Sequence, residues 1–326
     1  MMSLRVLAIQ LKRIGDVLQT VPAVAALREA CPDVEVTILV EGGSAGLIPM
    51  IPGVCGFARG TPGFWGWLRS SYDVCLDFSG TDRSAWYAAL SRADRRVTFQ
   101  RFRKRWTQRL ACNVFVESSV RERHTADHYV DLLSGMGVHG QSGPLRLDVP
   151  PLSREIARLL PEAPYAVIHA GAARAEKFWP PERWAAVARA LFERFRLEVV
   201  LTGSRSAVEQ SHIQGIRRSL SSVPAWDLSG ATTLPELAGV IRGAAIFCGV
   251  DTAAMHLADA VGTPCVALFG PTNPFHWAPR QTRSVVLRAG VSAPFLPCQK
   301  GAPLDALPAE EVIASAASLL TQKAPA

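Results

Sequence analysis

The sequence lacks several short motifs that identify common enzyme classes. It has no GxGxxG turn and no GxxxxGK[ST] loop, which disfavours nicotinamide-dependent and P-loop chemistry. It also has no HExxH motif and no CxxC pair, and its seven cysteines are scattered and odd in number. Because most of these cysteines stand inside apolar runs, we expect them to act as small hydrophobic residues in a thiol-reduced, cytoplasmic protein.

Long hydrophobic runs are missing as well. With 48% apolar and 19% charged residues, the chain has the composition of a globular protein. Its apolar runs are short and interrupted by charge or glycine, so we expect no membrane-spanning segment. The first ten residues are too short an apolar stretch for a signal peptide, and no cleavage-like site follows them. A length of 326 residues predicts about two domains.

The positive charge is concentrated in one segment. The net charge is +7, and residues 92–123 hold ten Lys and Arg against three Asp and Glu, which leaves 25 of each sign elsewhere. Phe102 and Trp106 are interleaved with these cations. Such a segment fits a nucleic acid, an anionic membrane surface or a phosphorylated ligand. Composition alone supports a solvated basic loop equally well.

Apolar runs of strand length alternate with helical patterns along the chain. We expect strands at 4–10, 34–40, 72–80, 95–100, 165–172, 197–203, 246–251 and 264–270. Helices are expected at 16–30, 181–195, 205–220 and 252–262, with an Ala/Ser-rich helix at 308–322. This order predicts an α/β protein with doubly wound parallel sheets.

The alternation breaks once, at Pro150 and Pro151, which predicts a domain boundary there. We therefore expect one α/β domain at 1–150 and another at 151–326, with the last helix free to pack back on the first domain. Open parallel sheets bind ligands beyond the carboxyl ends of their strands. Two such sheets facing each other predict a ligand cleft lined by the loops that follow strands.

Charged and small residues occupy these loops. Asp16 closes "LKRIGD" after the first strand, where spacing alone favours a helix N-cap. In the second domain, Lys177 follows a small-residue loop and offers a point charge for a phosphate. Asp251 and Thr252 open a later helix, whose free N–H groups form an anion site. His256, one turn further on, is more often structural in such a position.

One histidine pair has the spacing of two metal ligands. His124 and His128 are four residues apart, with Asp127 between them. Because no third ligand has suitable local spacing, we favour one face of a helix over a metal site.

Four stretches together resemble a known family. They are "LKRIGDVLQTVPAVAALR" (11–28), "HAGAARAEKFWPPERWAAVARAL" (169–191), "LTGSRSAVEQ" (201–210) and "GVDTAAMHLADAVGTPCVALFGPTNP" (249–274). In this order they resemble the bacterial heptosyltransferases of glycosyltransferase family 9, and the resemblance covers essentially the whole chain. It implies a GT-B fold of two Rossmann-like domains, with the acceptor bound by the first and the nucleotide-sugar by the second. It also implies inverting transfer of heptose from ADP-heptose to a phosphorylated, lipid-anchored saccharide of the lipopolysaccharide inner core, without cofactor or metal.

The resemblance further implies roles for individual residues. Asp16 falls on the general base, while Lys177 and Asp251 complete the catalytic set by meeting the donor. The expected donor-binding residues are His169, Gly171, Ala172, Lys177, Gly203, Glu209, Asp251, Thr252, Ala253 and His256. The expected acceptor-binding residues are Lys12, Arg13, Arg101, Arg103, Lys104, Arg105 and His124.

Two departures from the family pattern leave the donor open. Ala253 stands where the family usually has glycine, and "HAGAA" replaces a loop that usually resembles "HPGS". One alternative is therefore a transferase of the same fold for another nucleotide-sugar or glycan acceptor. A second is a nucleic-acid-binding protein using residues 92–123, which the balanced charge of the remaining chain disfavours. We expect a monomer without nucleic acid, in peripheral contact with the cytoplasmic face of the inner membrane through that segment.

Overall fold

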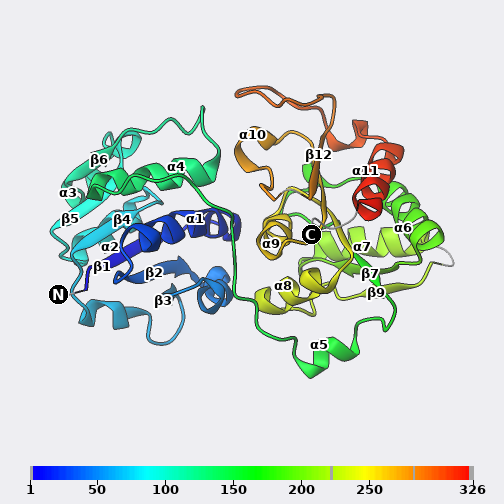
Figure 1. Cartoon of the computed structure of the whole chain (residues 1–326), viewed down its shortest axis with the longest axis horizontal. Helices are drawn as coiled ribbons and strands as arrows, with labels where there is room; N and C mark the ends of the chain where they lie inside the picture. Colours follow the sequence, from blue (N-terminus) through cyan, green and yellow to red (C-terminus); the bar gives the residue numbers. More distant parts are fainter. Residues whose placement is uncertain (1–2, 221–222, 282, 323–326) are drawn as a thin grey trace. The chain divides into compact units, whose positions relative to one another are not determined.

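The chain folds into two compact units, Met1–Asp148 and Val149–Ala326. The computed structural model describes residues 3–220, 223–281 and 283–322. Figure 1 shows a sheet flanked by helices in each unit, from blue to green in the first and from green to red in the second. The division falls beside the adjacent prolines Pro150 and Pro151.

The first unit is built on a six-stranded parallel sheet with the order β3-β2-β1-β4-β5-β6. Its strands are β1 (Arg5–Gln10), β2 (Glu35–Glu41), β3 (Val54–Arg59), β4 (Val74–Asp77), β5 (Arg95–Phe99) and β6 (Val114–Val116). Its α-helices are α1 (Ile14–Ala30), α2 (Asp82–Leu90), α3 (Trp106–Ala111) and α4 (Thr125–Asp131). Its 3₁₀ helices are η1 (Gly42–Met50), η2 (Phe64–Arg69), η3 (Gln100–Phe102) and η4 (Leu132–Met136).

The second unit repeats this plan with the order β12-β11-β10-β7-β8-β9, again all parallel. Its strands are β7 (Tyr165–His169), β8 (Glu198–Thr202), β9 (Ala225–Asp227), β10 (Ile246–Val250), β11 (Cys265–Phe269) and β12 (Ser284–Arg288). Its α-helices are α5 (Arg154–Arg158), α6 (Pro181–Phe195), α7 (Ala207–Ser219), α8 (Leu234–Gly243), α9 (Ala253–Val261), α10 (Pro274–Trp277) and α11 (Ala309–Thr321). The 3₁₀ helices are η5 (Ala175–Lys177) and η6 (Leu304–Ala306).

Both sheets have the strand order of a Rossmann fold, which confirms the predicted doubly wound α/β class. In each sheet the order reverses at one place, between β1 and β4 in the first unit and between β7 and β10 in the second. The loops that leave two neighbouring strands there diverge to opposite faces of the sheet. This switch point is where ligands of open α/β sheets bind.

One face of the first sheet is covered by η2, α2 and α3. Their inward side chains, Phe64 and Trp67 from η2, Tyr87 from α2 and Ala111 from α3, belong to one buried cluster with side chains of β1, β2 and β4. The helix α1 joins β1 to β2 in the reverse direction, and the right-handed crossover therefore places it on the opposite face. There it packs against α4.

The structure corrects the expectation for the first helix and shows how the last one packs within its own unit. The first helix begins at Ile14 with Arg13 as its N-cap, so Asp16 lies within the first turn rather than at the cap. The last helix, α11, packs on α6 and on β10, β11 and β12 of its own unit. Its buried residues Val312, Ala316 and Leu319 belong to the core of the second unit.

A search of the described residues for a membrane-spanning helix finds none that combines the length and the apolar character required.

The packing of α11 predicts the effect of truncating one of its side chains. Leu319 is 3% exposed, so Leu319→Ala leaves a cavity in the core of the second unit and should lower the free energy of unfolding by about 2 to 4 kcal/mol. Chemical denaturation monitored by circular dichroism measures this loss. Ala314→Ser, an exposed change in the same helix, serves as the control and should cost about 0.5 kcal/mol or less. Equal stabilities of the two variants would contradict the packing.

Candidate active site

The two loops at the switch point of the first unit are bonded to each other. The backbone N–H of Leu11, just after β1, donates to Oγ of Ser79, just after β4, over 2.6 Å. Asp16 lies one turn further on, in the first turn of α1. The predicted base therefore stands at the edge of the sheet where ligands of this fold bind.

Asp16 is held by a tyrosine from a distant part of the chain. The hydroxyl of Tyr129, on α4, donates to Oδ1 of Asp16 over 2.8 Å. The second carboxylate oxygen, Oδ2, has no hydrogen bond with any described residue. Burial raises the pKa of Tyr129, and the negative charge of Asp16 raises it further, so the phenol stays a proton donor. One oxygen of Asp16 is thus fixed, and the other is left to accept a proton.

Two cations flank Asp16 and share one aromatic ring. Lys12 Nζ lies 5.9 Å from the ring centroid of Phe102, and Arg101 Cζ lies 4.5 Å from the same centroid. Burial lowers the pKa of Lys12, while the charge of Asp16 opposes this effect. Burial also lowers the pKa of Arg101, opposed by Tyr129 and Asp16. A carboxylate beside the half-buried Lys12 and the exposed Arg101 suits an anionic substrate.

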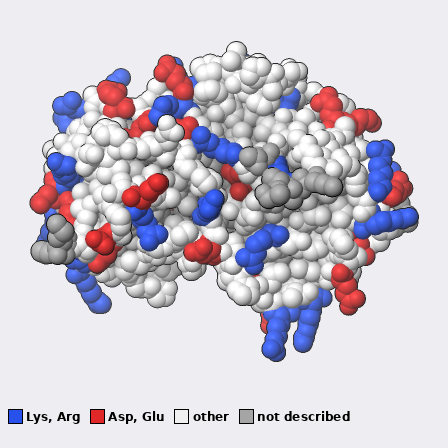
Figure 2. Space-filling model, viewed as in Figure 1, with Lys and Arg blue, Asp and Glu red and all other residues white. Residues whose placement is uncertain are grey.

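The other expected acceptor residues are not gathered around Asp16. Arg13 is exposed at the N-cap of α1, and Arg103 lies over the ring of Phe115, with Cζ 5.4 Å from the centroid. Lys104 and Arg105 are exposed, and Arg105 lies 3.8 Å from Asp82. On the face that Figure 2 shows, basic and acidic side chains are interspersed rather than separated by sign. Of the predicted acceptor cations, the structure therefore brings Lys12 and Arg101 to the base.

His124 and His128 do not form the helix face that their spacing predicts. His124 is the N-cap of α4, where its Nδ1 accepts from the backbone N–H of Ala126 over 3.2 Å. His128 is fully buried, stacked on Phe99 at 3.9 Å between centroids, and bonded to Ser118 through Nδ1. Among the residues that the structure describes, no group of three or more His, Cys, Asp or Glu could hold a metal ion.

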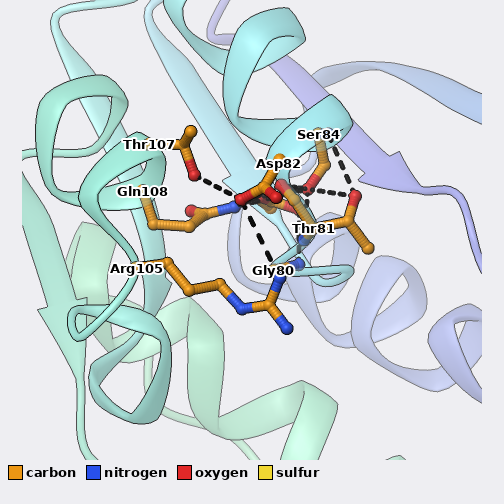
Figure 3. A network of polar contacts seen from close by, with 8 residues as sticks. Gly80, Thr81, Asp82, Ser84, Arg105, Thr107 and Gln108 are labelled. Carbon is orange, nitrogen blue, oxygen red and sulfur yellow. Dashed lines mark hydrogen bonds and ion pairs between the residues drawn. The ribbon is translucent and has the colours of Figure 1, made fainter.

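A buried carboxylate organises the loop after β4. Asp77 Oδ1 accepts from the backbone N–H groups of Ser79 and Gly80, and Oδ2 accepts from Ser84 Oγ over 2.7 Å and Gln108 Nε2 over 2.8 Å. Figure 3 shows Gln108 and Ser84 converging on this point from α3 and α2. Burial raises the pKa of Asp77, and these four donors oppose the rise. The network fixes the loop beside the base and ties α3 to α2.

In the second unit, an ion pair connects the loops that follow β7 and β10. Lys177 Nζ donates to Oδ2 of Asp251 over 2.6 Å and to the Asp251 carbonyl over 2.9 Å. Both side chains are mostly buried, at 16% and 10% exposed. Two predicted donor residues, 74 positions apart in the chain, therefore meet at the switch point of this sheet.

The remaining small and polar residues of this edge surround His169 and Glu209. His169 ends β7, and its Nδ1 is hydrogen-bonded to Thr202 Oγ1 at the end of β8 over 2.9 Å. Glu209 Oε2 accepts from the backbone N–H of Ser204 over 2.7 Å. A Cβ at Gly171 would lie 2.2 Å from this same oxygen, and one at Gly203 would lie 2.6 Å from Ile213. A side chain at either position would therefore have to displace the end of Glu209 or of Ile213.

The helix α9 begins directly after the ion pair. Thr252 is its N-cap, its side chain does not cap the helix, and Ala253 is the first helical residue. Ala172 and His256 are buried, and the ring of His256 lies 6.2 Å from that of Trp277. The first-turn N–H groups of α9 thus adjoin Lys177, and together they can stabilise a diphosphate.

Comparison with known proteins shows the same architecture elsewhere. A solved structure described as ADP-heptose LPS heptosyltransferase II of E. coli is similar with a TM-score of 0.78 at 19% identity, covering 97% of this chain and 98% of that one. A bacterial iron-containing dodecameric glycosyltransferase, TibC, from enterotoxigenic E. coli is similar with a TM-score of 0.61 at 16% identity, covering 98% of this chain and 77% of that one.

Two curated relatives extend the likeness to sequence. Lipopolysaccharide heptosyltransferase 3 of Escherichia coli (strain K12) is 34% identical over 179 residues, which span 53% of this chain and about half, 52%, of that relative. Lipopolysaccharide heptosyltransferase 1 of Pseudomonas aeruginosa is 27% identical, covering 91% of this chain and 86% of that protein.

Two successive Rossmann-type units, each with its ligand loops at a switch point, have the GT-B fold. The family model for glycosyltransferase family 9 (heptosyltransferase) matches residues 64–302. The chain belongs to that family, as the resemblance predicted.

Two buried histidines predict a loss of stability in acid. Burial lowers the pKa of His169 to about 4 and that of His128 to about 3, against an ordinary value of 6.5. Below pH 6.5 the unfolded chain binds protons that the folded chain refuses, so stability falls as the pH falls. Between pH 7 and pH 5 each histidine should cost about 2 kcal/mol of unfolding free energy.

Denaturation curves at pH 7, 6 and 5 measure this dependence. His169→Asn keeps a polar partner for Thr202 but does not titrate, so its unfolding free energy should fall by about 2 kcal/mol less over the same range. Parallel pH profiles for the variant and the native chain would refute a neutral His169.

Proposed function

We propose that this glycosyltransferase moves heptose from ADP-heptose to a phosphorylated inner-core saccharide of lipopolysaccharide, with inversion and without a resident metal. The observation that carries the proposal is the contrast between the switch points of the two units. The first presents a carboxylate with one unbonded oxygen, and the second presents a lysine beside a helix N-terminus. Family membership and the names of the curated relatives supply the substrate class.

On the acceptor side, Asp16 acts as the general base. The attacking hydroxyl oxygen forms a bond to C1 of the heptose and gives its proton to Oδ2 of Asp16. The bond between C1 and the phosphate oxygen breaks, and ADP leaves with the bonding electrons. Tyr129 holds the other carboxylate oxygen, which supports a fixed orientation of the base.

On the donor side, Lys177 and the first turn of α9 stabilise the charge that develops on ADP. Lys177 is already oriented by Asp251 at 2.6 Å. A diphosphate attracts the ammonium, and the sugar hydroxyls can donate to the carboxylate that the ammonium leaves. Asp251 thus serves both to place Lys177 and to meet the sugar.

The cations beside Asp16 suit the acceptor that we propose. Lys12 and Arg101 lie over the same ring and would meet the phosphate groups of an inner-core saccharide. Among the described residues, none of the contacts made by residues 92–123 favours a nucleic acid over a phosphorylated saccharide. The same segment contains Arg103, Lys104 and Arg105, which are exposed and can contribute long-range attraction.

The absence of a metal from the proposed mechanism rests on Lys177. A cation at the donor phosphates supplies the charge that a divalent ion supplies in other transferases. The TibC neighbour is described as iron-containing, so the proposal needs a direct test with a chelator.

Ala253 does not argue against the donor site. It is the first residue of α9 and is not among the residues with positive φ, so the position does not demand glycine for its backbone. The methyl group adds bulk next to the N–H groups that would face a phosphate. We therefore expect Ala253 to influence which nucleotide-sugar binds rather than whether the chain folds.

Removal of the base tests the mechanism. Asp16→Asn should lower kcat for ADP release by at least about 100-fold, because general-base catalysis typically contributes that much. The assay uses purified protein, ADP-heptose and a truncated phosphorylated lipopolysaccharide, with EDTA present throughout. Native turnover that persists in EDTA supports transfer without a metal. Undiminished turnover in Asp16→Asn would remove Asp16 from the chemistry.

The donor screen separates the proposed sugar from its alternatives. ADP-heptose should give faster turnover than UDP- and GDP-hexoses with the same acceptor. Native protein that binds ADP but turns over only another nucleotide-sugar would keep the fold and the site and replace heptose.

Loss of the lysine tests the donor site separately. Lys177→Met should weaken ADP binding by about 10- to 100-fold, since a charge-assisted hydrogen bond contributes roughly 1.5 to 3 kcal/mol. Isothermal titration calorimetry measures the affinity. Lys300→Met, an exposed lysine of the same unit, is the matched control and should bind ADP as the native chain does. Equal affinities of both variants would remove Lys177 from the donor site.

A further inference from the structure

Among residues 3–148, the large exposed apolar side chains are confined to three neighbouring elements. They are between 44% and 73% exposed and occur in pairs on η2, α2 and α3: Trp65 and Leu68, Trp86 and Leu90, Trp106 and Leu110. We call these six residues the tryptophan face. In the second unit, the comparable residues are scattered singly, at Leu159, Val208, Trp226 and Leu296.

The three elements form one layer. Their inner side chains pack in a single buried cluster on one face of the sheet, so their outer side chains point away from that same face. The ring of Trp65 lies 5.9 Å from that of Tyr87, which joins η2 to α2. Thr107 donates to Asp82 over 2.6 Å, which joins α3 to α2. The tryptophan face is therefore one surface rather than three isolated spots.

On α2 and α3, helical spacing aligns the exposed apolar side chains in two stripes, one along each helix. Trp86 and Leu90 are four residues apart on α2, and so are Trp106 and Leu110 on α3. Four residues is the spacing that aligns side chains along one side of a helix. An apolar stripe of this kind normally faces a core, but here it faces outward.

The charge around the stripes is mainly positive. The three elements carry Arg69, Arg83 and Arg109 against one acid, Asp82. Arg83 is paired with Glu41 at 2.9 Å, while Arg69 and Arg109 have no ion pair among the described residues. Tryptophan beside arginine is the composition of surfaces that sit at the boundary between water and anionic lipid.

The position of the stripes relative to the base matters for a lipid-anchored substrate. The helices α2 and α3 start just after the carboxyl ends of β4 and β5, at the edge of the sheet that carries Asp16. Trp106 is the first residue of α3 and directly follows the exposed basic residues Arg103 to Arg105. A bilayer in contact with η2, α2 and α3 would therefore lie beside the edge of the sheet that carries Asp16.

We propose that the tryptophan face docks the first unit on an anionic phospholipid bilayer. Trp65, Trp86 and Trp106 insert at the level of the headgroups, and Arg69 and Arg109 bind lipid phosphates. The inference rests on the proposed function only in assuming a lipid-anchored acceptor. Docking itself requires neither the nucleotide-sugar nor the acceptor.

Vesicle cosedimentation tests the docking. The native protein should bind vesicles of phosphatidylcholine mixed with phosphatidylglycerol, bind phosphatidylcholine alone more weakly, and lose binding as salt is raised. The triple variant Trp86→Ser/Trp106→Ser/Leu110→Ser removes the most exposed apolar area and should lower the partition coefficient by about tenfold or more. Circular dichroism confirms that the exposed substitutions leave the fold intact.

A matched variant on the second unit controls for exposed apolar area in general. Leu159→Ser/Val208→Ser/Leu296→Ser should bind vesicles as the native protein does. Native protein that does not sediment with anionic vesicles would overturn the proposal, and so would equal binding by both triple variants. Sedimentation velocity adds a further case: a native dimer that the tryptophan variant makes monomeric, with vesicle binding unaltered, would assign the face to a second copy.

Transfer to a soluble, delipidated acceptor separates this proposal from the proposed function. The tryptophan variant should keep native turnover with that acceptor while losing turnover on acceptor embedded in vesicles. Vesicle binding without any heptose transfer by the native protein would refute the proposed function and leave the docking surface standing.

Discussion

The reversal of strand order at the middle of each sheet is the constraint on which the candidate site depends. All strands are parallel, so every loop after a strand lies at one edge, and only at the reversal do two neighbouring loops part. Each unit then fastens the parted loops with a polar contact. In the first it is the bond between Leu11 and Ser79, and in the second it is the pair of Lys177 with Asp251. The strand order therefore fixes where the candidate site lies in each unit, whatever side chains the loops carry.

The two switch points are opposite in electrostatic design. The first places a carboxylate beside the half-buried Lys12 and the exposed Arg101, and partial desolvation lowers the pKa of both cations. The second pairs a cation with a carboxylate at the start of a helix. In the proposed reaction, a base that receives a proton and a leaving group that carries charge away would require these two different environments.

The sequence predicted the central strands of both sheets but not their edges. Strands buried on both faces read as apolar runs, whereas β3, β6, β9 and β12 are short or only partly buried and have no such pattern. Spacing and resemblance predict individual loop residues such as Lys177, but they do not predict which of these residues pair with each other. Tyr129 lies 113 positions from Asp16, and no local pattern announces a contact over that separation. Asp77 carries a readable signal in the sequence, an acid at a strand end with Ser79 and Gly80 two and three residues further on.

In the proposed donor site without ligand, the charge of Lys177 is already neutralised by its ion pair with Asp251. A simple anion without a hydrogen-bond donor, such as sulfate, must compete with a carboxylate that already holds the ammonium at 2.6 Å, and it offers nothing to the carboxylate it displaces. A nucleotide-sugar brings both a phosphate for the lysine and hydroxyl groups for the aspartate. In the proposed donor site, the pair would therefore discriminate by requiring two chemical groups on one molecule rather than by shape alone.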